Sequence, residues 1–255
     1  MVKKYVVFDL DETLGYFTEL GIIWSCLETV YNASGQESFN ELCRVFEKEY
    51  FRPGIFKVMR FLKEQGNDVR VVLYTNNTGS VKWLKLLLSY IEERSGGGEI
   101  FHRIVPGYRP GMKGPHARTS FNKTYSEIIR CADIPSDAKI IFFDDLKHEK
   151  MLHPNVTYIN VRPFFHPLRA TYIIEKLQNS YFRFMDYSSN SYLYKCIRSF
   201  HNNYISNGHH KRSTRVSKDD IIEPLRIFLN KRKRTIKRVK KSNRSKTRKG
   251  SKSDE

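Results

Sequence analysis

The stretch Tyr5–Thr13, which reads YVVFDLDET, decides how the rest of the chain is understood. Its first four residues are apolar, as in a strand that is buried on both faces of a parallel sheet. Asp9 and Asp11 follow where this strand ends, and because side chains alternate along an extended chain, both carboxylates are expected to point the same way. Two adjacent carboxylates repel each other unless a metal ion, a shared proton or another cation offsets the charge. The stretch therefore predicts a site for metal-assisted chemistry.

Apolar runs that end in polar residues recur further along the chain. Val69–Tyr74 ends at Thr75, and Lys139–Phe143 ends at Asp144 and Asp145. Helical patterns separate these runs, which predicts an α/β fold: a Rossmann-like parallel sheet flanked by helices, with right-handed crossovers. In such sheets ligands bind at the carboxyl ends of the strands, where these polar residues are expected to lie.

Hydrophobic periodicity predicts further elements around these strands. Helices are expected over residues 38–51, 54–65, 80–93, 123–132, 171–186 and 217–236, and strands at residues 104–105 and 156–161. Residues 106–122 are expected to form a basic loop and residues 200–216 a polar one. Trp24 and Trp83 are expected to serve in packing.

Positive charge is concentrated at the end of the chain. The 255 residues carry a formal charge of +18, and Lys231–Glu255 holds 13 Lys or Arg residues against 2 acids. Such a segment is typical of a nuclear-import signal or of an arm that binds nucleic acid through counterion release. We therefore expect an α/β domain over residues 1–175, a helical extension over 176–241 and a disordered basic tail over 242–255.

Cysteine usage and hydropathy favour an intracellular protein. The four cysteines form no CxxC pair and fit no zinc pattern, so reduced core thiols are expected, in the nucleus or the cytoplasm. The first residues lack the pattern of a signal peptide, and no segment is long and uncharged enough to span a membrane. We therefore expect no membrane partner.

The polar residues at the strand ends form an ordered set: Asp9, Asp11, Thr13, Thr75, a lysine, Asp144 and Asp145. This order resembles the motifs of the haloacid dehalogenase superfamily of phosphotransferases, and the resemblance covers roughly residues 4–165. It implies a phosphomonoester hydrolase that works with Mg²⁺.

The resemblance also implies a role for each residue. Asp9 would be the nucleophile that forms an aspartyl phosphate, and Asp11 the general acid and then the general base. Thr75 would donate a hydrogen bond to the phosphoryl oxygens. Mg²⁺ would be held by Asp9, by Asp144 or Asp145, and by the backbone carbonyl of Asp11.

A lysine would neutralise the nucleophile and the phosphate. Lys123 opens the helix that leads into the third buried strand, which is where the superfamily places this residue. Lys113, in the basic loop, is the alternative.

Within the superfamily, the sequence is most similar to the small protein-serine phosphatases that act on the C-terminal domain of RNA polymerase II. The shared features are Asp9–Leu14 (DLDETL), Arg52–Gly54 before a helix, and the pair Asp144 and Asp145. Residues 15–50 are too few for a large cap domain. A small cap or none would admit a bulky substrate, such as a phosphorylated peptide or a nucleic-acid end.

Three hypotheses for the function follow. The first is a Mg²⁺-dependent phosphatase of phosphoserine or phosphothreonine in proteins. The second is a phosphatase of nucleic-acid 3′-phosphates, indicated by the positive charge and by Thr75–Asn77. The third is a non-catalytic binding module that keeps the fold, against which the intact carboxylates argue. The expected partners are a phosphorylated protein or peptide and, through the tail, nucleic acid or an import receptor.

Overall fold

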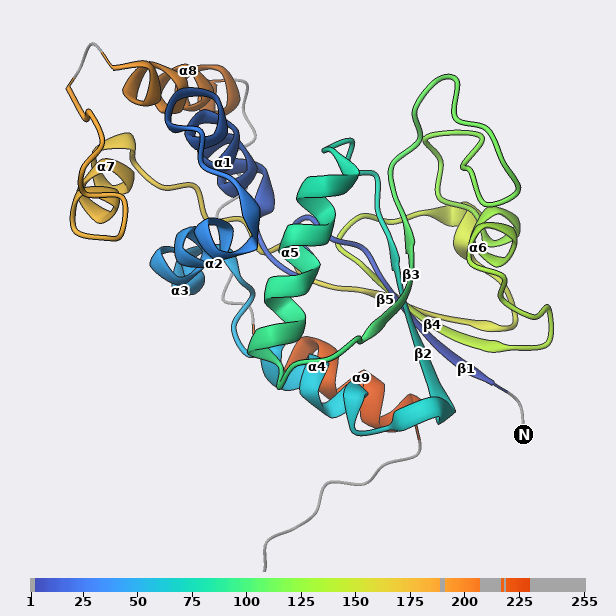
Figure 1. Ribbon diagram of the computed structural model, residues 1–255. Helices are drawn as coiled ribbons and strands as arrows, with labels where there is room; N and C mark the ends of the chain where they lie inside the picture. The colour runs from blue at the N-terminus through green and yellow to red at the C-terminus, as the bar shows by residue number, and fades with distance from the viewer. Residues whose placement is uncertain (1–2, 189–190, 207–216, 218, 230–255) are drawn as a thin grey trace, which may run out of the picture.

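A parallel sheet forms the centre of the molecule (Figure 1). The computed structural model describes residues 3–188, 191–206, 217 and 219–229. The strand order is β3-β2-β1-β4-β5, and every neighbouring pair is parallel. The strands are β1 (Lys4–Phe8), β2 (Val69–Tyr74), β3 (Phe101–Val105), β4 (Lys139–Asp144) and β5 (Val156–Asn160). The predicted α/β fold with a Rossmann-like parallel sheet is confirmed.

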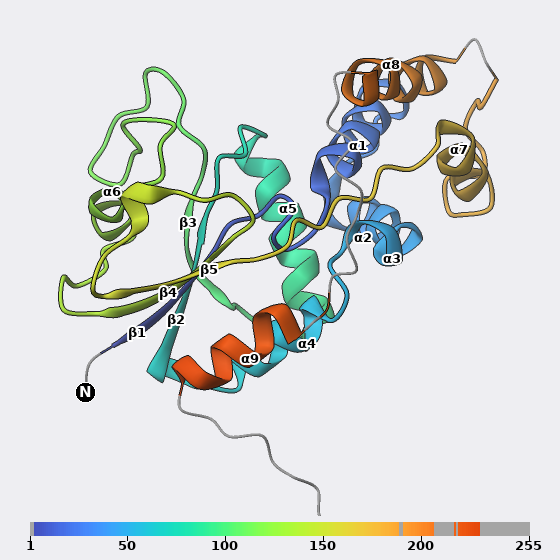
Figure 2. The ribbon, with the colours of Figure 1, turned by 180° about the vertical axis from the view of Figure 1, so that it is seen from behind.

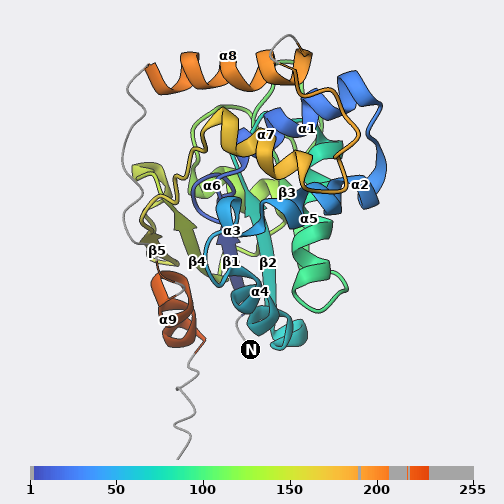
Figure 3. The same ribbon diagram turned by 90° about the vertical axis from the view of Figure 1, so that its left-hand side faces the viewer.

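Helices cover both faces of the sheet and the side to which its strands point. The helices are α1 (Phe17–Tyr31), α2 (Gly35–Val45), α3 (Glu47–Tyr50), α4 (Ile55–Lys63), α5 (Val81–Arg94), α6 (Tyr125–Cys131), α7 (Ala170–Gln178), α8 (Tyr192–Ser206) and α9 (Asp219–Phe228), with short 3₁₀ turns at Gly66–Asp68 and Glu149–Met151. Helix α6 lies on one face, and α4, α5 and α9 lie on the other (Figure 2). Helices α1, α7 and α8 gather beyond the carboxyl ends of the strands (Figure 3).

Strand β1 is buried on both faces, as its unbroken apolar run predicts. Val6 and Phe8 belong to the large cluster that they share with α1, α4 and α5. Tyr5 and Val7 belong to the second cluster, on the α6 face. Because alternate side chains serve two cores, a central strand of this kind cannot alternate apolar with polar residues.

The register of the three central strands brings their carboxyl ends to one edge. Phe8 of β1 lies alongside Leu73 of β2 and Phe143 of β4. The polar residues that follow each strand therefore leave the sheet at the same level, as the sequence predicted.

Helices α4, α5 and α6 and strands β2, β4 and β5 agree with the predicted elements to within two residues. The predicted helix over 38–51 is wrong in detail, because α2 and α3 are separate helices divided at Phe46. The helix expected over 171–186 ends at Gln178, and α8 occupies part of the expected loop over 200–216. Residues 207–216 lie outside the described residues, and so do residues 230–255, which include the end of the helix expected over 217–236 and the basic tail. Within the described part of the chain, no helix has the length and apolarity needed to cross a membrane.

Helix α1 falls in the interval that is too short for a large cap domain. Its apolar residues do not form one stripe, because α1 is covered from several sides, including by α2 and α8. Periodicity detects helices with one buried face, so a helix surrounded by neighbours gives a weak signal. The interval forms three helices, which is a small helical insertion over the carboxyl ends of the strands (Figure 3).

A buried arginine holds the turn that follows β1. The guanidinium group of Arg52 donates hydrogen bonds to the backbone carbonyls of Glu12, Thr13 and Arg162. Glu12 has a φ of 58°, a left-handed conformation that costs a non-glycine residue energy and persists only when its surroundings enforce it. Burial lowers the pKa of Arg52 to about 10, so the group remains charged at neutral pH. Arg52 therefore enforces the shape of the loop that carries Asp11.

Replacing Arg52 by leucine tests this role. We expect Arg52→Leu to lower the free energy of unfolding by about 3 kcal/mol, because three backbone carbonyls lose their donor inside the protein. Urea denaturation measures the change. Arg44→Leu is the matched control, since Arg44 forms a half-exposed ion pair with Glu41 on α2 and is expected to change the free energy by less than about 0.5 kcal/mol. Equal losses in the two variants would contradict the assignment.

Candidate active site

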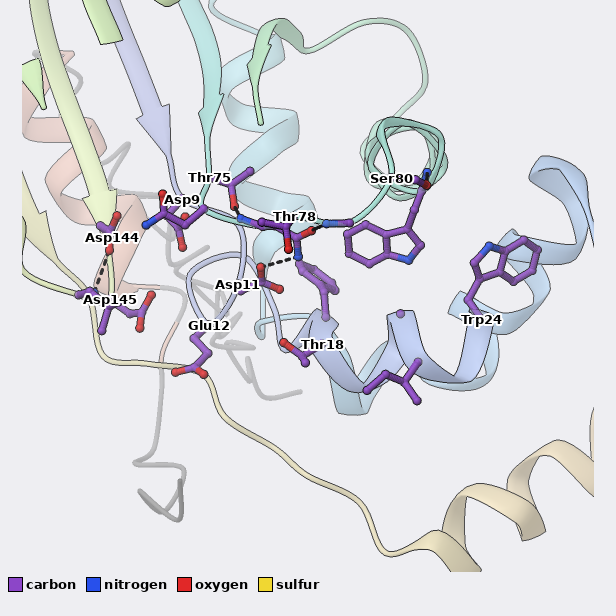
Figure 4. A pocket seen from close by; sticks show the side chains of 18 of the residues that line it. Asp9, Asp11, Glu12, Thr18, Trp24, Thr75, Thr78, Ser80, Asp144 and Asp145 are labelled. Atoms are coloured by element: carbon purple, nitrogen blue, oxygen red, sulfur yellow. Dashed lines mark hydrogen bonds between the residues drawn. The ribbon is translucent and has the colours of Figure 1, made fainter. Parts of the chain in front are cut away.

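A cavity of about 760 Å³ lies at the carboxyl ends of β1, β2 and β4 (Figure 4). The loop after each of these strands contributes to its wall, and α1 and the start of α5 close the opposite side. Asp9, Asp11, Thr75, Lys123, Asp144 and Asp145 all line this cavity. The structure therefore brings these six predicted residues to one cavity, whereas Thr13 is not part of its wall and contacts Asp145 instead.

The ammonium group of Lys123 lies between two buried carboxylates. Its Nζ donates to Oδ1 of Asp9 and, at 2.7 Å, to Oδ2 of Asp144. All three side chains are buried, and Lys123 is only 2% exposed. Lys123 reaches this position because Thr124 caps α6, its hydroxyl accepting from the backbone N–H of Glu127 at 3.1 Å. Of the two lysines that the sequence left open, Lys123 lines the cavity, whereas Lys113 is exposed and is not part of its wall.

Asp11 is held by the loop after β2. The side-chain amide of Asn77 donates to Oδ2 of Asp11 at 2.7 Å, and the backbone N–H of Asn77 donates to the hydroxyl of Thr75 at 2.9 Å. Burial, and then the charge of Asp9, raise the pKa of Asp11 to about 7, although the Asn77 hydrogen bond opposes the shift. Asp11 is therefore a carboxyl group that can give or take a proton near neutral pH.

Asn77 keeps its position through a close backbone approach. Its backbone carbonyl accepts from the N–H of Gly107 at 3.1 Å. A Cβ added at Gly107 would lie 2.6 Å from that carbonyl oxygen, so only glycine fits there. The loop after β3 thus packs directly on the loop that carries Thr75.

Arg118 comes from the basic loop but points into the protein. Its guanidinium group donates to the carbonyl of Thr75 at 2.9 Å and to the side chain of Asn76 at 2.7 Å. Glu127 on α6 pairs with it at 2.9 Å, and the same carboxylate accepts from the hydroxyl of Tyr74. Arg118 therefore fixes the loop after β2 and adds no charge to the surface.

Asp144 and Asp145 follow β4 and have different surroundings. Burial acts to raise the pKa of Asp144, but contacts with His148 and Lys123 outweigh it and hold that pKa below its usual value. Burial, together with the charges of Asp9 and Glu12, raises the pKa of Asp145 to about 7. The hydroxyl of Thr13 donates to Asp145 at 3.2 Å and accepts from its backbone N–H at 3.1 Å.

Three carboxylates are close enough to share a cation. One oxygen each from Asp9, Asp144 and Asp145 lie within 4.8 Å of one another. Hard carboxylate oxygens are the ligands that Mg²⁺ prefers, and burial together with the charges of Asp9 and Glu12 raises the pKa of Asp145, so the donor set fits this ion. The carboxylate of Asp11 is not part of the group.

Sequence reasoning missed several residues of the site. Asn77, marked in the sequence only as part of Thr75–Asn77, is the partner of Asp11, and Arg118, expected only as part of the basic loop, holds the loop after β2. Trp24 and Trp83, expected only to pack, line the cavity. His148 lies 3.3 Å from Asp144, whereas His153 stacks on Tyr125. Glu127 could have revealed Arg118, because this acid lies on the helix expected over residues 123–132 and can pair with an arginine that comes from the preceding loop.

Comparisons with known proteins give distant structural likenesses. No family model matches the sequence, and no curated protein matches it. The HAD domain of the effector protein Lem4 from Legionella pneumophila is similar over 72% of this chain and 98% of that chain, with 14% identity and a TM-score of 0.39. CbbY from Rhodobacter sphaeroides, solved in complex with phosphate, is similar over 62% and 93%, with 16% identity and a TM-score of 0.30. Scores this low support no argument about activity, which rests on the geometry of the site.

The raised pKa values of Asp11 and Asp145 predict how stability depends on pH. A carboxyl with a raised pKa stays protonated in the folded protein at pH values where the unfolded chain has lost the proton. In the presence of a chelator, the free energy of unfolding should therefore fall as pH rises from about 4 to about 7. At pH 7.5 we expect Asp11→Asn or Asp145→Asn to raise the free energy of unfolding by about 2 kcal/mol relative to the wild type.

Urea denaturation at a series of pH values measures this effect. Asp137→Asn is the control, because Asp137 is exposed and lies outside the cavity. The prediction is contradicted if the wild-type free energy of unfolding stays constant across this pH range, or if the variants follow the wild-type curve. Either result would mean that the pKa values of the two carboxyls are not raised.

Proposed function

We propose that this protein is a phosphomonoester hydrolase of the haloacid dehalogenase type, which works with Mg²⁺ and an aspartyl-phosphate intermediate. The observation that carries the proposal is the arrangement around Asp9. Its carboxylate pairs with Lys123, and Asp11, with a pKa near 7, lines the same cavity. A nucleophile, a cationic partner and a proton-transfer group thus share one cavity.

In the proposed reaction Asp9 attacks the phosphorus atom, and the bond from phosphorus to the leaving oxygen breaks. Asp11 gives that oxygen its proton, leaving an alcohol and the aspartyl phosphate. Asp11 then takes a proton from water, which attacks the phosphorus, releases phosphate and restores Asp9. The Oδ1 atom of Asp11 has no hydrogen-bond partner among the described residues, which leaves it available for this exchange.

Lys123 and Thr75 stabilise the charge on the phosphoryl oxygens. Asp9 and Asp144 or Asp145, with the backbone carbonyl of Asp11, would hold the Mg²⁺ ion. When bound, this ion supplies positive charge against the repulsion between the carboxylate and the phosphate dianion.

For the substrate we propose phosphoserine or phosphothreonine in a protein or peptide. The proposal is supported by the likeness of Asp9–Leu14 and Arg52–Gly54 to the phosphatases of the RNA polymerase II C-terminal domain. A wide cavity beside a small insertion also leaves room for a bulky leaving group.

Loss of Asp9 tests the proposed chemistry. We expect Asp9→Asn to lower the turnover of an aryl phosphate at least about a thousandfold, because the nucleophile is lost. A chelator should abolish wild-type turnover and added Mg²⁺ should restore it, whereas Asp137→Asn should stay at the wild-type rate. Retained turnover in Asp9→Asn would remove the basis for the assignment.

The second candidate function is hydrolysis of nucleic-acid 3′-phosphates, which the charge of +18 favours. A phosphoserine peptide and a 3′-phosphorylated oligonucleotide, assayed side by side with Mg²⁺, separate the two substrates. Absence of turnover on both substrates, in a protein that is correctly folded, would instead favour a non-catalytic binding module.

We further propose that the basic segment Lys231–Glu255 binds nucleic acid or an import receptor. Its charge density supports this role, because neutralised phosphates release counterions. We expect oligonucleotide binding to weaken steeply between about 50 and 200 mM salt, and replacement of the four basic residues Lys231–Arg234 by alanine to flatten that dependence. Electrophoretic mobility shift at several salt concentrations measures it, with aryl phosphate turnover as the control that should not change. Binding that ignores salt would contradict the proposal.

A further inference from the structure

Helix α9 comes late in the chain but belongs to the core beneath the cavity. It lies beside α4 on one face of the sheet (Figure 2). Its residues Ile221 and Leu225 are fully buried in the same cluster as Phe8 of β1. At the end of the helix, the backbone carbonyl of Phe228 accepts from Nζ of Lys4 at 3.0 Å. Helix α9 is therefore docked on the α/β domain and is not a separate appendage.

The first turn of α9 brings a carboxylate to the buried Arg52. Oδ2 of Asp220 lies 3.9 Å from Nη1 of Arg52, an ion pair in which the arginine side chain is fully buried and the aspartate is 25% exposed. Within the described chain, Nη1 is the one nitrogen of this guanidinium group that lacks a hydrogen-bond partner. Burial lowers the pKa of Arg52, and the charges of Asp220 and then Asp145 oppose that shift. A buried charge depends on such opposite charges, and Asp220 supplies one from outside the cavity.

The other two nitrogens of Arg52 hold the turn after β1. They donate to the backbone carbonyls of Glu12 and Thr13, among others. Asp11, directly before these two residues, lines the cavity, and the hydroxyl of Thr13 donates to Asp145 at 3.2 Å. The turn that Arg52 holds therefore sets the positions of two carboxylates of the site.

We propose that Asp220 is a positioning residue for the active site: its charge holds the guanidinium group of Arg52, and through Arg52 it fixes the turn that carries Asp11. Asp220 itself is not part of the cavity wall. The geometry of the site is thus coupled to the docking of α9. The effect on turnover rests on the phosphatase function proposed above, whereas the effect on the turn is measurable without any activity.

Asp220 also caps its own helix, and the test has to separate the two roles. Its Oδ2 accepts from the backbone N–H of Ser217 at 3.2 Å, and negative charge is favourable in the first turn of a helix. Asp220→Asn keeps an oxygen for Ser217 and removes the charge. Asp219→Asn is the matched control, because Asp219 lies in the same turn but is exposed and lines the groove between α4 and α9. Both variants remove one charge from the start of the helix.

Hydrogen exchange of the full-length protein, resolved by residue in the presence of a chelator, measures the opening of the turn. The backbone N–H groups of Glu12 and Leu14 donate hydrogen bonds within the turn, at 2.7 and 2.9 Å. Such groups exchange when the turn opens locally. We expect Asp220→Asn to speed the exchange of both about three- to tenfold, the effect of losing a partly exposed ion pair to a buried group. Asp219→Asn should change it less than about twofold.

A double-mutant cycle with Arg52→Leu shows whether the effect passes through the guanidinium group. In the Arg52→Leu background Asp220 has no guanidinium group to hold, so Asp220→Asn should speed the exchange of the turn by less than about a further twofold. A role in capping alone would act in both backgrounds equally. If Arg52→Leu does not fold, the comparison of Asp220→Asn with Asp219→Asn decides by itself.

Turnover of an aryl phosphate with Mg²⁺ measures the consequence for the site. We expect Asp220→Asn to lower kcat about three- to tenfold and to change KM less than about twofold, because the turn carries the proton-transfer group Asp11. Asp219→Asn should keep the wild-type kcat.

The proposal is overturned if the two variants change the exchange of the turn equally, if Asp220→Asn speeds exchange in α9 but not in the turn, or if its effect is undiminished in the Arg52→Leu background. An unchanged kcat in Asp220→Asn, for a wild type that is active, also overturns it. The exchange measurements require no turnover. Failure of the positioning role is therefore distinguishable from failure of the phosphatase function, which the Asp9→Asn assay decides.

Discussion

The ammonium group of Lys123, placed between the carboxylates of Asp9 and Asp144, is the interaction on which the site depends. The parallel sheet brings the ends of β1 and β4 together, and with them two buried negative charges. Burying charges is costly unless they are paired, and one buried lysine offsets only part of this negative charge. Burial, and then the charge of Asp9, raise the pKa values of Asp11 and Asp145, and a divalent cation between the carboxylates would oppose this shift.

Two further buried cations organise the loops around this centre. Arg52 holds the turn after β1 through backbone carbonyls, and Arg118 holds the loop after β2 in the same manner. Neither arginine is available to a ligand, because both guanidinium groups are engaged inside the protein. Part of the positive charge of the described domain therefore stabilises loops. Counting basic residues in the sequence therefore overstates the charge that the site presents to a substrate.

The helical insertion between β1 and α4 contributes one wall of the cavity through α1. Helix α1 faces the start of α5, and Trp24 and Trp83 line the cavity from these two helices. The carboxylates of the cavity thus come from the ends of the strands, whereas the apolar part of its wall comes from the insertion and from α5.

The sequence by itself determined the parallel sheet, the strand ends at Asp9, Thr75 and Asp144, and the residue classes of the site, because buried strands and their polar ends are local patterns. Only the tertiary structure decided which lysine meets the carboxylates and that Arg118 points inward. It alone placed Trp24 of α1 and Trp83 of α5 in one wall. These outcomes depend on contacts between segments far apart in the chain, and neither periodicity nor spacing records such contacts. Helix α1 was missed for the same reason, since its neighbours cover it on several sides.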